Sequence, residues 1–421
     1  MIRDFFKIIF GLAICVFFLA HSVNSASISD LQAKIDEYSR NKEALEKEIT
    51  KYQTELNAVL GQANSLQNTI KSLDLSSQKL TAEIKLTQNN INQTNLGINN
   101  TGVEISNQEN RIDRNKLAVR NILREVDQVD SRSLFEFLLE NKSLSGVSAN
   151  LESLLTLQDR IDEKIDELKT VKTELESTKL SLEQKKKKLE EYNKDLANQK
   201  IVLQNTIKEK NNLLTQTKNT QSNFEKILAE KKALMDAFDR ELSAAEAALK
   251  LAIDPKSYPT PRKGVLSWPV DNVIITQNFG YTSFAKTAYA SGYHNGTDFG
   301  VSIGTRIKSA GSGVVEGVGD TDSVCPGASF GKWVFIRYDS GLASTYAHLS
   351  LITAKAGQRV KSGDIVGYSG NTGYSIGPHL HMSLYASQGV KISTLKSAVC
   401  KGTYTMPIAD PKAYLDPLLY L

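Results

Sequence analysis

The chain has few aromatic residues, few cysteines and almost no excess of charge. Aromatic residues make up 7% of the 421 residues and concentrate after about residue 258. Lysine and arginine number 51 against 47 aspartate and glutamate residues, which leaves a formal net charge of only +4. Because the two signs are evenly mixed, the charge gives no reason to expect a nucleic-acid partner. The length allows two or three domains.

Long apolar runs are also scarce, and the one at the N-terminus is short. It covers residues 8–20 and follows a start that contains Arg3 and Lys7. This run is too short to span a bilayer comfortably, but it is typical of a signal peptide. Small residues precede a cleavage point near Ser25, so we expect residues 1–25 to be a secretory signal peptide. The alternative is an uncleaved membrane anchor, and in both cases we expect the rest of the chain to be exported.

Cysteine is rare, and removal of residues 1–25 would leave only Cys325 and Cys400 of the three. An even pair in an exported chain is compatible with a disulfide. The spacing by itself does not place the two side chains together, so a bridge and two free thiols both stay open.

A heptad pattern of apolar residues runs from Ile28 to about Val129 without interruption. So long a register predicts a left-handed coiled coil. The d positions turn polar between Thr87 and Asn115, where asparagine is frequent and two glycines occur. Helix propensity is low there, so we expect a weak or bent segment.

The heptad is lost near residues 131–148, which we interpret as the tip of a hairpin. A second stripe has leucine at every seventh residue up to Leu203 and continues, after a shift of phase, to Leu249. The two arms have similar lengths, so we predict an antiparallel coiled-coil hairpin over residues 28–252. Three prolines within residues 253–264 predict a linker.

Residues 265–421 have a different composition, with short β-rich runs between glycines and no useful stretch of helical period. These runs are 273–276, 313–316, 333–338 and 364–368. We predict an all-β domain that is large enough to have its own core. The expected fold class is therefore α plus all-β, with a long helical hairpin followed by the β-domain.

Four of the five histidines lie in this β-domain, at positions 294, 348, 379 and 381. His379 and His381 are one residue apart, which in a strand puts both imidazoles on one face and Leu380 on the other. His294 is followed four residues later by Asp298. Three or more imidazoles and a carboxylate on β-like sequence suit a zinc ion with an open coordination position.

Several stretches of the domain resemble the lysostaphin-type (LytM-like) zinc endopeptidases of bacterial cell walls. The matching segments are Trp-Pro-Val at 268–270, Gln-Asn-Phe-Gly at 277–280, His-Asn-Gly-Thr-Asp-Phe-Gly at 294–300, Thr-Tyr-Ala-His-Leu at 345–349, Ser-Gly-Asn-Thr-Gly-Tyr-Ser at 369–375 and Gly-Pro-His-Leu-His at 377–381. They cover roughly residues 265–390, with the expected core at 290–390.

The resemblance implies an antiparallel β-sheet groove in which Zn²⁺ is held by His294, Asp298 and His381. It also implies that His348 and His379 line the site as catalytic histidines. The chain departs from the family pattern in an insertion that carries Cys325 and in a tail after Ser387 that carries Cys400. A Cys325–Cys400 bridge would tie this tail to the edge of the domain.

The two helical arms and residues 133–145 between them are similar to the helical regulatory region of the PcsB and EnvC groups of division-associated cell-wall proteins. This second resemblance is less specific. It implies a docking arm for an FtsEX-like membrane complex and a region that holds the wall-cutting domain in check. A homodimer is left open.

We therefore expect a secreted zinc metalloendopeptidase that cleaves peptide cross-links of bacterial peptidoglycan during cell-wall remodelling or division. Zinc would lower the pKa of a bound water to about 7, while His348 and His379 would move protons or stabilise the developing oxyanion. Which histidine does which is open. One alternative is a non-catalytic, EnvC-like activator of cell-wall amidases, and another is a structural spacer with a wall-binding β-domain. All five site residues are present, which favours the enzyme.

Overall fold

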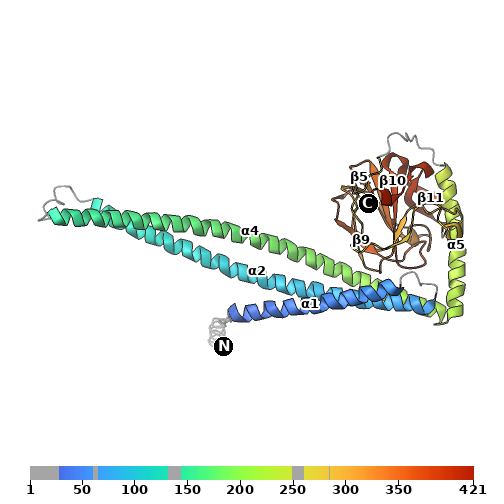
Figure 1. Ribbon diagram of the computed structural model, residues 1–421, viewed down its shortest axis with the longest axis horizontal. Helices are drawn as coiled ribbons and strands as arrows, with labels where there is room; N and C mark the ends of the chain where they lie inside the picture. Colours follow the sequence, from blue (N-terminus) through green and yellow to red (C-terminus); the bar gives the residue numbers. More distant parts are fainter. Residues whose placement is uncertain (1–27, 60–64, 131–143, 249–259, 284) are drawn as a thin grey trace, which may run out of the picture. The chain divides into compact units, whose positions relative to one another are not determined.

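The computed structural model describes residues 28–59, 65–130, 144–248, 260–283 and 285–421. Four long helices come first and an antiparallel β-domain follows, which confirms the predicted fold class (Figure 1). The expected signal peptide, most of the expected tip and the first half of the expected linker lie outside the described residues. No helix in the described ranges has both the length and the apolar character of a membrane span.

The long helices are α1 (Ile28–Val59), α2 (Leu66–Asp130), α4 (Leu144–Thr217) and α5 (Gln221–Ala248). The chain divides into two compact units. One consists of the chain up to Asn41 with Asn92–Lys185, and the other of Lys42–Ile91 with Lys186–Leu421. The second unit therefore joins parts of the helices to the whole β-domain.

Within each unit, α2 and α4 run antiparallel. In the first unit, Lys179 Nζ lies 2.9 Å from Glu109 Oε1. In the second unit, the Thr87 hydroxyl donates to Gln199 Oε1 at 2.9 Å. A second pair in each unit, Thr101 with Lys185 in the first and Asp74 with Lys210 in the second, shows that the partner position on α4 falls in number as the position on α2 rises. This is the pairing of a helical hairpin.

The polar d positions of α2 do not interrupt the helix, which is continuous from Leu66 to Asp130. The expected weak segment is therefore not a break. Thr87 bonds to Gln199, and Gln108 Nε2 donates to Thr178 Oγ1 at 3.2 Å. Polar side chains of α4 thus bond to two of the polar d positions of α2, although Gln108 Oε1 and Asn115 Nδ2 stay buried without a partner among the described residues.

The expectation of one uninterrupted arm from Ile28 to Val129 is wrong. Leu56 of α1 and Leu75 of α2 belong to the same buried cluster. In one straight helix these residues would lie about 28 Å apart along the axis. Helices α1 and α2 are therefore two helices that share a buried cluster and are not one straight helix.

The second arm is also divided, because α4 ends at Thr217 and α5 begins at Gln221. Lys218 and Asn219 have φ angles of 47° and 56°. Two successive left-handed residues end a right-handed helix. The stripe that continues to Leu249 was expected to pack in the hairpin, but buried Phe238 of α5 packs in a cluster with β-domain residues.

The β-domain is built from three antiparallel sheets. The main sheet has the order β1-β2-β10-β6-β5-β4-β8 with β13 beside β10, the second has the order β3-β9-β7, and the third is the hairpin β11-β12. The strands are β1 (Ile275–Gln277), β2 (Thr297–Phe299), β3 (Arg306–Lys308), β4 (Gly313–Asp320), β5 (Lys332–Tyr338), β6 (Leu342–Ala347), β7 (Leu349–Ile352), β8 (Arg359–Val360), β9 (Ile365–Ser369), β10 (Leu380–Ala386), β11 (Val390–Lys396), β12 (Thr403–Ala409) and β13 (Tyr414–Leu415). Each of the four predicted β-rich runs overlaps one of these strands.

The main sheet buries both of its faces. On β5, Val334 and Ile336 belong to one hydrophobic cluster, and Trp333 and Phe335 belong to another. This alternation follows from the two-residue period of a strand. The second cluster also contains residues of β11, β12 and α5. The tail beyond the resembling segment and helix α5 therefore cover one face of the sheet together.

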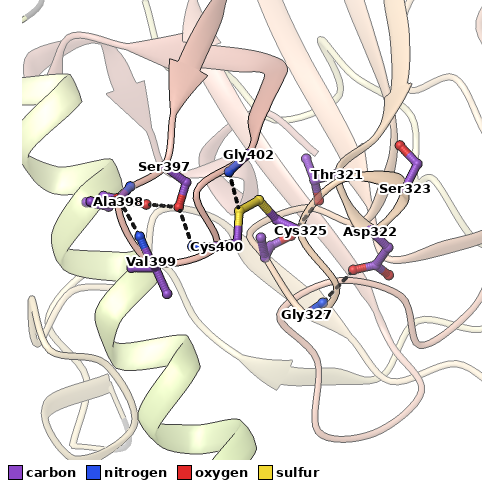
Figure 2. The surroundings of a disulfide bond; sticks show 12 residues. Thr321, Asp322, Ser323, Cys325, Gly327, Ser397, Ala398, Val399, Cys400 and Gly402 are labelled. Atoms are coloured by element: carbon purple, nitrogen blue, oxygen red, sulfur yellow. Dashed lines mark hydrogen bonds between the residues drawn. A yellow bond between two sulfur atoms is a disulfide. The ribbon is translucent and has the colours of Figure 1, made fainter.

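A disulfide joins Cys325 to Cys400, with the two Cα atoms 5.7 Å apart (Figure 2). Cys325 lies in the loop after β4, next to a short 3-10 helix at Thr321–Ser323. Cys400 lies in the turn between β11 and β12. The bridge thus ties the insertion to the C-terminal hairpin.

Candidate metal centre

Three side chains converge at the ends of two neighbouring strands. Asp298 of β2 and His381 of β10 are direct partners across the antiparallel pair. His381 Nδ1 lies 2.9 Å from Asp298 Oδ1, and His294 Nε2 lies 3.1 Å from that nitrogen. One donor atom from each residue lies within 4.8 Å of the other two. The fold therefore brings together the three residues that the sequence suggested as ligands.

Hydrogen bonds on the far side of each imidazole determine which nitrogen faces the cluster. His294 Nδ1 is 3.0 Å from the Asn278 carbonyl oxygen. A carbonyl can only accept, so Nδ1 carries a proton and Nε2 faces the cluster, where the neutral ring offers a lone pair to a metal ion. His381 Nε2 is 2.9 Å from Ser383 Oγ, which can accept its proton and leave Nδ1 facing the cluster. Metal-binding histidines are usually oriented by such partners.

The cluster has the donors that zinc prefers, namely two imidazole nitrogens and one carboxylate oxygen. A Cβ atom at Gly296 would lie 2.7 Å from the His381 ring, so the backbone approaches the ring as closely as a glycine allows. His294, Asp298 and His381 are 2%, 6% and 5% exposed. Because the three donors are buried and convergent, the residues fit a zinc ion with room for a fourth ligand.

The charges in the cluster favour an ionised carboxylate. Burial alone would raise the pKa of Asp298, but His294 and His379 hold that pKa well below its usual range. Burial alone would lower the pKa of His294, and the neighbouring Asp298 outweighs it and raises that pKa. An anionic oxygen beside imidazole nitrogens is the electrostatic environment of a cation site.

The other two histidines line the same site. His348 sits at the corner between β6 and β7 with a φ of 61°, an unusual conformation for a residue with a side chain. Its Nδ1–H donates to the Thr372 carbonyl at 2.8 Å, and the Nδ1–H of His379 donates to the Gly377 carbonyl at 2.8 Å. The two ring centroids are 4.7 Å apart. Both imidazoles therefore keep Nε2 unprotonated when neutral, and burial lowers the pKa of His348 well below its usual range.

A cavity of about 600 Å³ adjoins these residues. His348, His379 and Tyr374 line it from the β-domain, and Phe238 and Glu246 line it from α5. Residues of the first turns of α2 also border it. Helices of the same compact unit therefore form part of the wall of the candidate site.

Three carboxylates attach α5 to the β-domain. Asp239 accepts from the Ser291 amide at 2.8 Å, and Glu246 accepts from the Tyr414 hydroxyl. Glu241 accepts from the Ser397 hydroxyl and from the amides of the two residues that follow it. Sequence reasoning missed these contacts because acidic residues beside a heptad stripe look like an ordinary solvated helix face.

Sequence reasoning also missed Ser383 and the carbonyl of Asn278. Ser383 could have been found, because it follows His381 by two residues and so shares its face of the strand. The Asn278 contact is made by the backbone, and no residue type signals it.

Comparison with known proteins gives a consistent result. Residues 292–393 match the model of peptidase family M23. The peptidoglycan DD-endopeptidase ShyA of Vibrio cholerae is 36% identical over 31% of this chain and 29% of its own length. The glycyl-glycine endopeptidase ALE-1 of Staphylococcus capitis is 39% identical over 25% of this chain and 28% of its own length.

A solved zinc-containing peptidase from Vibrio cholerae is 33% identical over 29% of this chain and 36% of that chain, with a TM-score of 0.26. Each of these matches covers about a third or less of this chain, and the residues matched by the family model lie beyond the four long helices. Within the β-domain, residues 292–393 constitute a domain of peptidase family M23.

Proposed function

We propose that the chain is a zinc metalloendopeptidase that cleaves peptide cross-links of bacterial peptidoglycan. The observation that carries this proposal is the convergence of His294, Asp298 and His381 inside a peptidase M23 domain. ShyA and ALE-1 are named as endopeptidases, the first of peptidoglycan and the second of glycyl-glycine bonds. Both names support a short wall peptide as the substrate.

The residues around the cluster suit peptide hydrolysis. Zinc, when bound, supplies a Lewis acid that makes hydroxide available near neutral pH and polarises the scissile carbonyl. His348 and His379 each hold a proton at Nδ1 on a backbone carbonyl and keep Nε2 as the acceptor nitrogen. One of them takes the proton of the attacking water at Nε2. The other can stabilise the oxyanion or protonate the leaving amine when it is an imidazolium, with a proton on both ring nitrogens.

We propose that the enzyme acts outside the cytoplasm, since its substrate is part of the cell wall. The N-terminal run at residues 8–20 would direct its export. The helical region is the proposed docking arm for a membrane complex of the FtsEX type. These assignments rest on the sequence pattern and on the resemblance of the helical arms to division-associated proteins.

We further propose that the helices restrain the enzyme. Phe238 and Glu246 of α5 form part of the wall of the cavity beside His348 and His379. A cross-linked wall peptide is an extended chain and needs an open groove. Movement of α5 away from the β-domain would therefore open the site to its substrate.

The alternative function is a non-catalytic activator of cell-wall amidases. Such a role needs neither the metal ligands nor a cavity beside them. Here the three donor atoms lie within 4.8 Å of one another, and both further histidines line the adjoining cavity. This arrangement favours the enzyme.

Digestion of purified peptidoglycan tests the proposal. The full-length chain should release new amine ends, and mass spectrometry of the fragments should identify one type of cleaved peptide bond. A His348→Gln variant should keep its metal and lose this activity. A zinc-loaded chain that releases no amine ends even when α5 has been released from the β-domain would refute the enzyme and favour the activator.

A further inference from the structure

The loop that holds His348 is itself held by a carboxylate outside the site. The Nδ1–H of His348 donates to the Thr372 carbonyl at 2.8 Å. The next amide along the chain, that of Gly373, donates to Asp322 Oδ2 at 2.7 Å. These two groups are the C=O and the N–H of one peptide unit. A single peptide thus lies between the Asp322 carboxylate and the His348 imidazole.

Asp322 is fixed in place by its own loop. Its second oxygen, Oδ1, accepts from the Gly327 amide at 2.7 Å, as Figure 2 shows. Asp320 caps the short helix at Thr321–Ser323 that carries Asp322. The disulfide of Cys325 closes the same loop against the β11–β12 turn. Both carboxylate oxygens are therefore used, one within the loop and one on the peptide beside His348.

The peptide beside His348 has little freedom to move. Gly373 has a φ of 69°, and a Cβ atom there would lie 2.2 Å from the Gly331 nitrogen. The Thr372 hydroxyl donates to the Leu349 carbonyl at 2.9 Å and accepts from the Lys332 amide at 3.0 Å. Within this rigid arrangement, the Gly373 amide donates to the side chain of Asp322.

We propose that Asp322 is a positioning residue for His348, acting through the Thr372–Gly373 peptide. Hydrogen bonds in series polarise one another, and bonds to a charged acceptor are the stronger ones. A carboxylate on the N–H makes the carbonyl of the same peptide a better acceptor for the imidazole proton. Asp322 thereby fixes the tautomer and orientation of His348 and directs Nε2 toward the site. This inference rests on the proposed role of His348 in hydrolysis.

An Asp322→Asn substitution in the full-length chain tests the inference. It keeps the shape of the side chain, removes the charge and replaces one of the two acceptor oxygens by a donor nitrogen. With a soluble cross-linked muropeptide as substrate, kcat should fall about tenfold, while KM and zinc content stay within twofold. In NMR spectra of the chain with ¹⁵N-labelled histidine, the Nδ1–H proton of His348 should move upfield. A His348→Gln variant assigns that resonance.

Asp320→Asn is the matched control, because it alters the same loop without touching the Thr372–Gly373 peptide. The proposal is overturned if Asp322→Asn leaves kcat and the resonance unchanged, or if Asp320→Asn has equal effects. If the Asp322→Asn chain does not fold, Asp322→Ser replaces it, because serine offers one neutral acceptor. An inactive wild-type chain would refute the proposed function alone, since the resonance still reports on the peptide contact.

Discussion

At the scale of single residues, the site depends on which nitrogen of each imidazole carries the proton. The sequence indicated the five side chains, and their resemblance to a known pattern suggested the roles. It could not indicate three of the four ring partners, because these are backbone carbonyls whose positions only the fold determines. The fourth partner is Ser383.

Removal of the Ser383 hydroxyl should weaken metal binding without removing a ligand. Ser383→Ala leaves His381 Nε2 without its partner at 2.9 Å, so the ring is held less firmly. We expect zinc affinity to fall about 10- to 100-fold, as measured by competition with a chelator.

Ser309→Ala is the control for that experiment. Ser309 is equally buried, and its hydroxyl donates to the Gly311 carbonyl, away from the ligands. Equal affinities in the two variants would show that Ser383 does not orient the metal site.

At the scale of elements, the sequence predicts the all-β character of the domain and four of its strands, but not the partners of the helices. Glycine-bounded β-rich runs locate strands because they report local geometry. A heptad stripe reports only that one face of a helix is buried, and not what buries it. For this reason the stripe through Met235 and Leu242 predicts packing within the hairpin, whereas Leu242 packs with the cluster on the β-domain. The turn at Lys218 and Asn219 carries no glycine or proline to mark it.

Release of α5 should raise activity if the helix restrains the site. Glu241→Ala removes three hydrogen bonds to the turn at residues 397–399. We expect faster release of amine ends from peptidoglycan and faster proteolysis of α5. Glu230→Ala, at an exposed position of the same helix, should change neither rate. If both variants match the wild type, this contact does not restrain the enzyme.

The docking of α5 should also depend on pH. Burial raises the pKa of Glu246 from 4.5 to about 7. The docked state therefore favours the protonated carboxyl. The contribution of this carboxyl to the stability of the docked state is complete below pH 4.5 and is lost as pH rises through 7. The shift corresponds to at most about 3 kcal/mol. Tyr414 bonds to Glu246 from the β-domain, Tyr293 and Tyr385 also face its charge, and Asp239 acts from α5 itself.

Hydrogen exchange of the α5 amides, corrected for the intrinsic pH dependence of exchange, measures this effect. Protection should fall between pH 5 and pH 8 in the wild type. Glu246→Gln, which mimics the protonated carboxyl, should lose that dependence. A variant that follows the wild-type pH curve would rule out Glu246 as the responsible group.

At the scale of the whole molecule, the division into compact units gives a physical basis for the proposed restraint of the enzyme by its helices. The unit that contains the β-domain also contains α5 and parts of α1, α2 and α4. The peptidase domain and the helix beside its cavity therefore belong to one compact body. The sequence suggested a domain boundary at the proline-rich segment, because the composition changes there. Helix α5, which precedes that segment, nevertheless packs against the β-domain.

The most direct test of the central claim is the zinc content of the purified full-length chain, measured by elemental mass spectrometry. We expect one zinc per wild-type chain and loss of that zinc in both His381→Ala and Asp298→Asn. A wild-type chain without stoichiometric zinc, or variants that retain it, would contradict the claim that these residues form a metal centre.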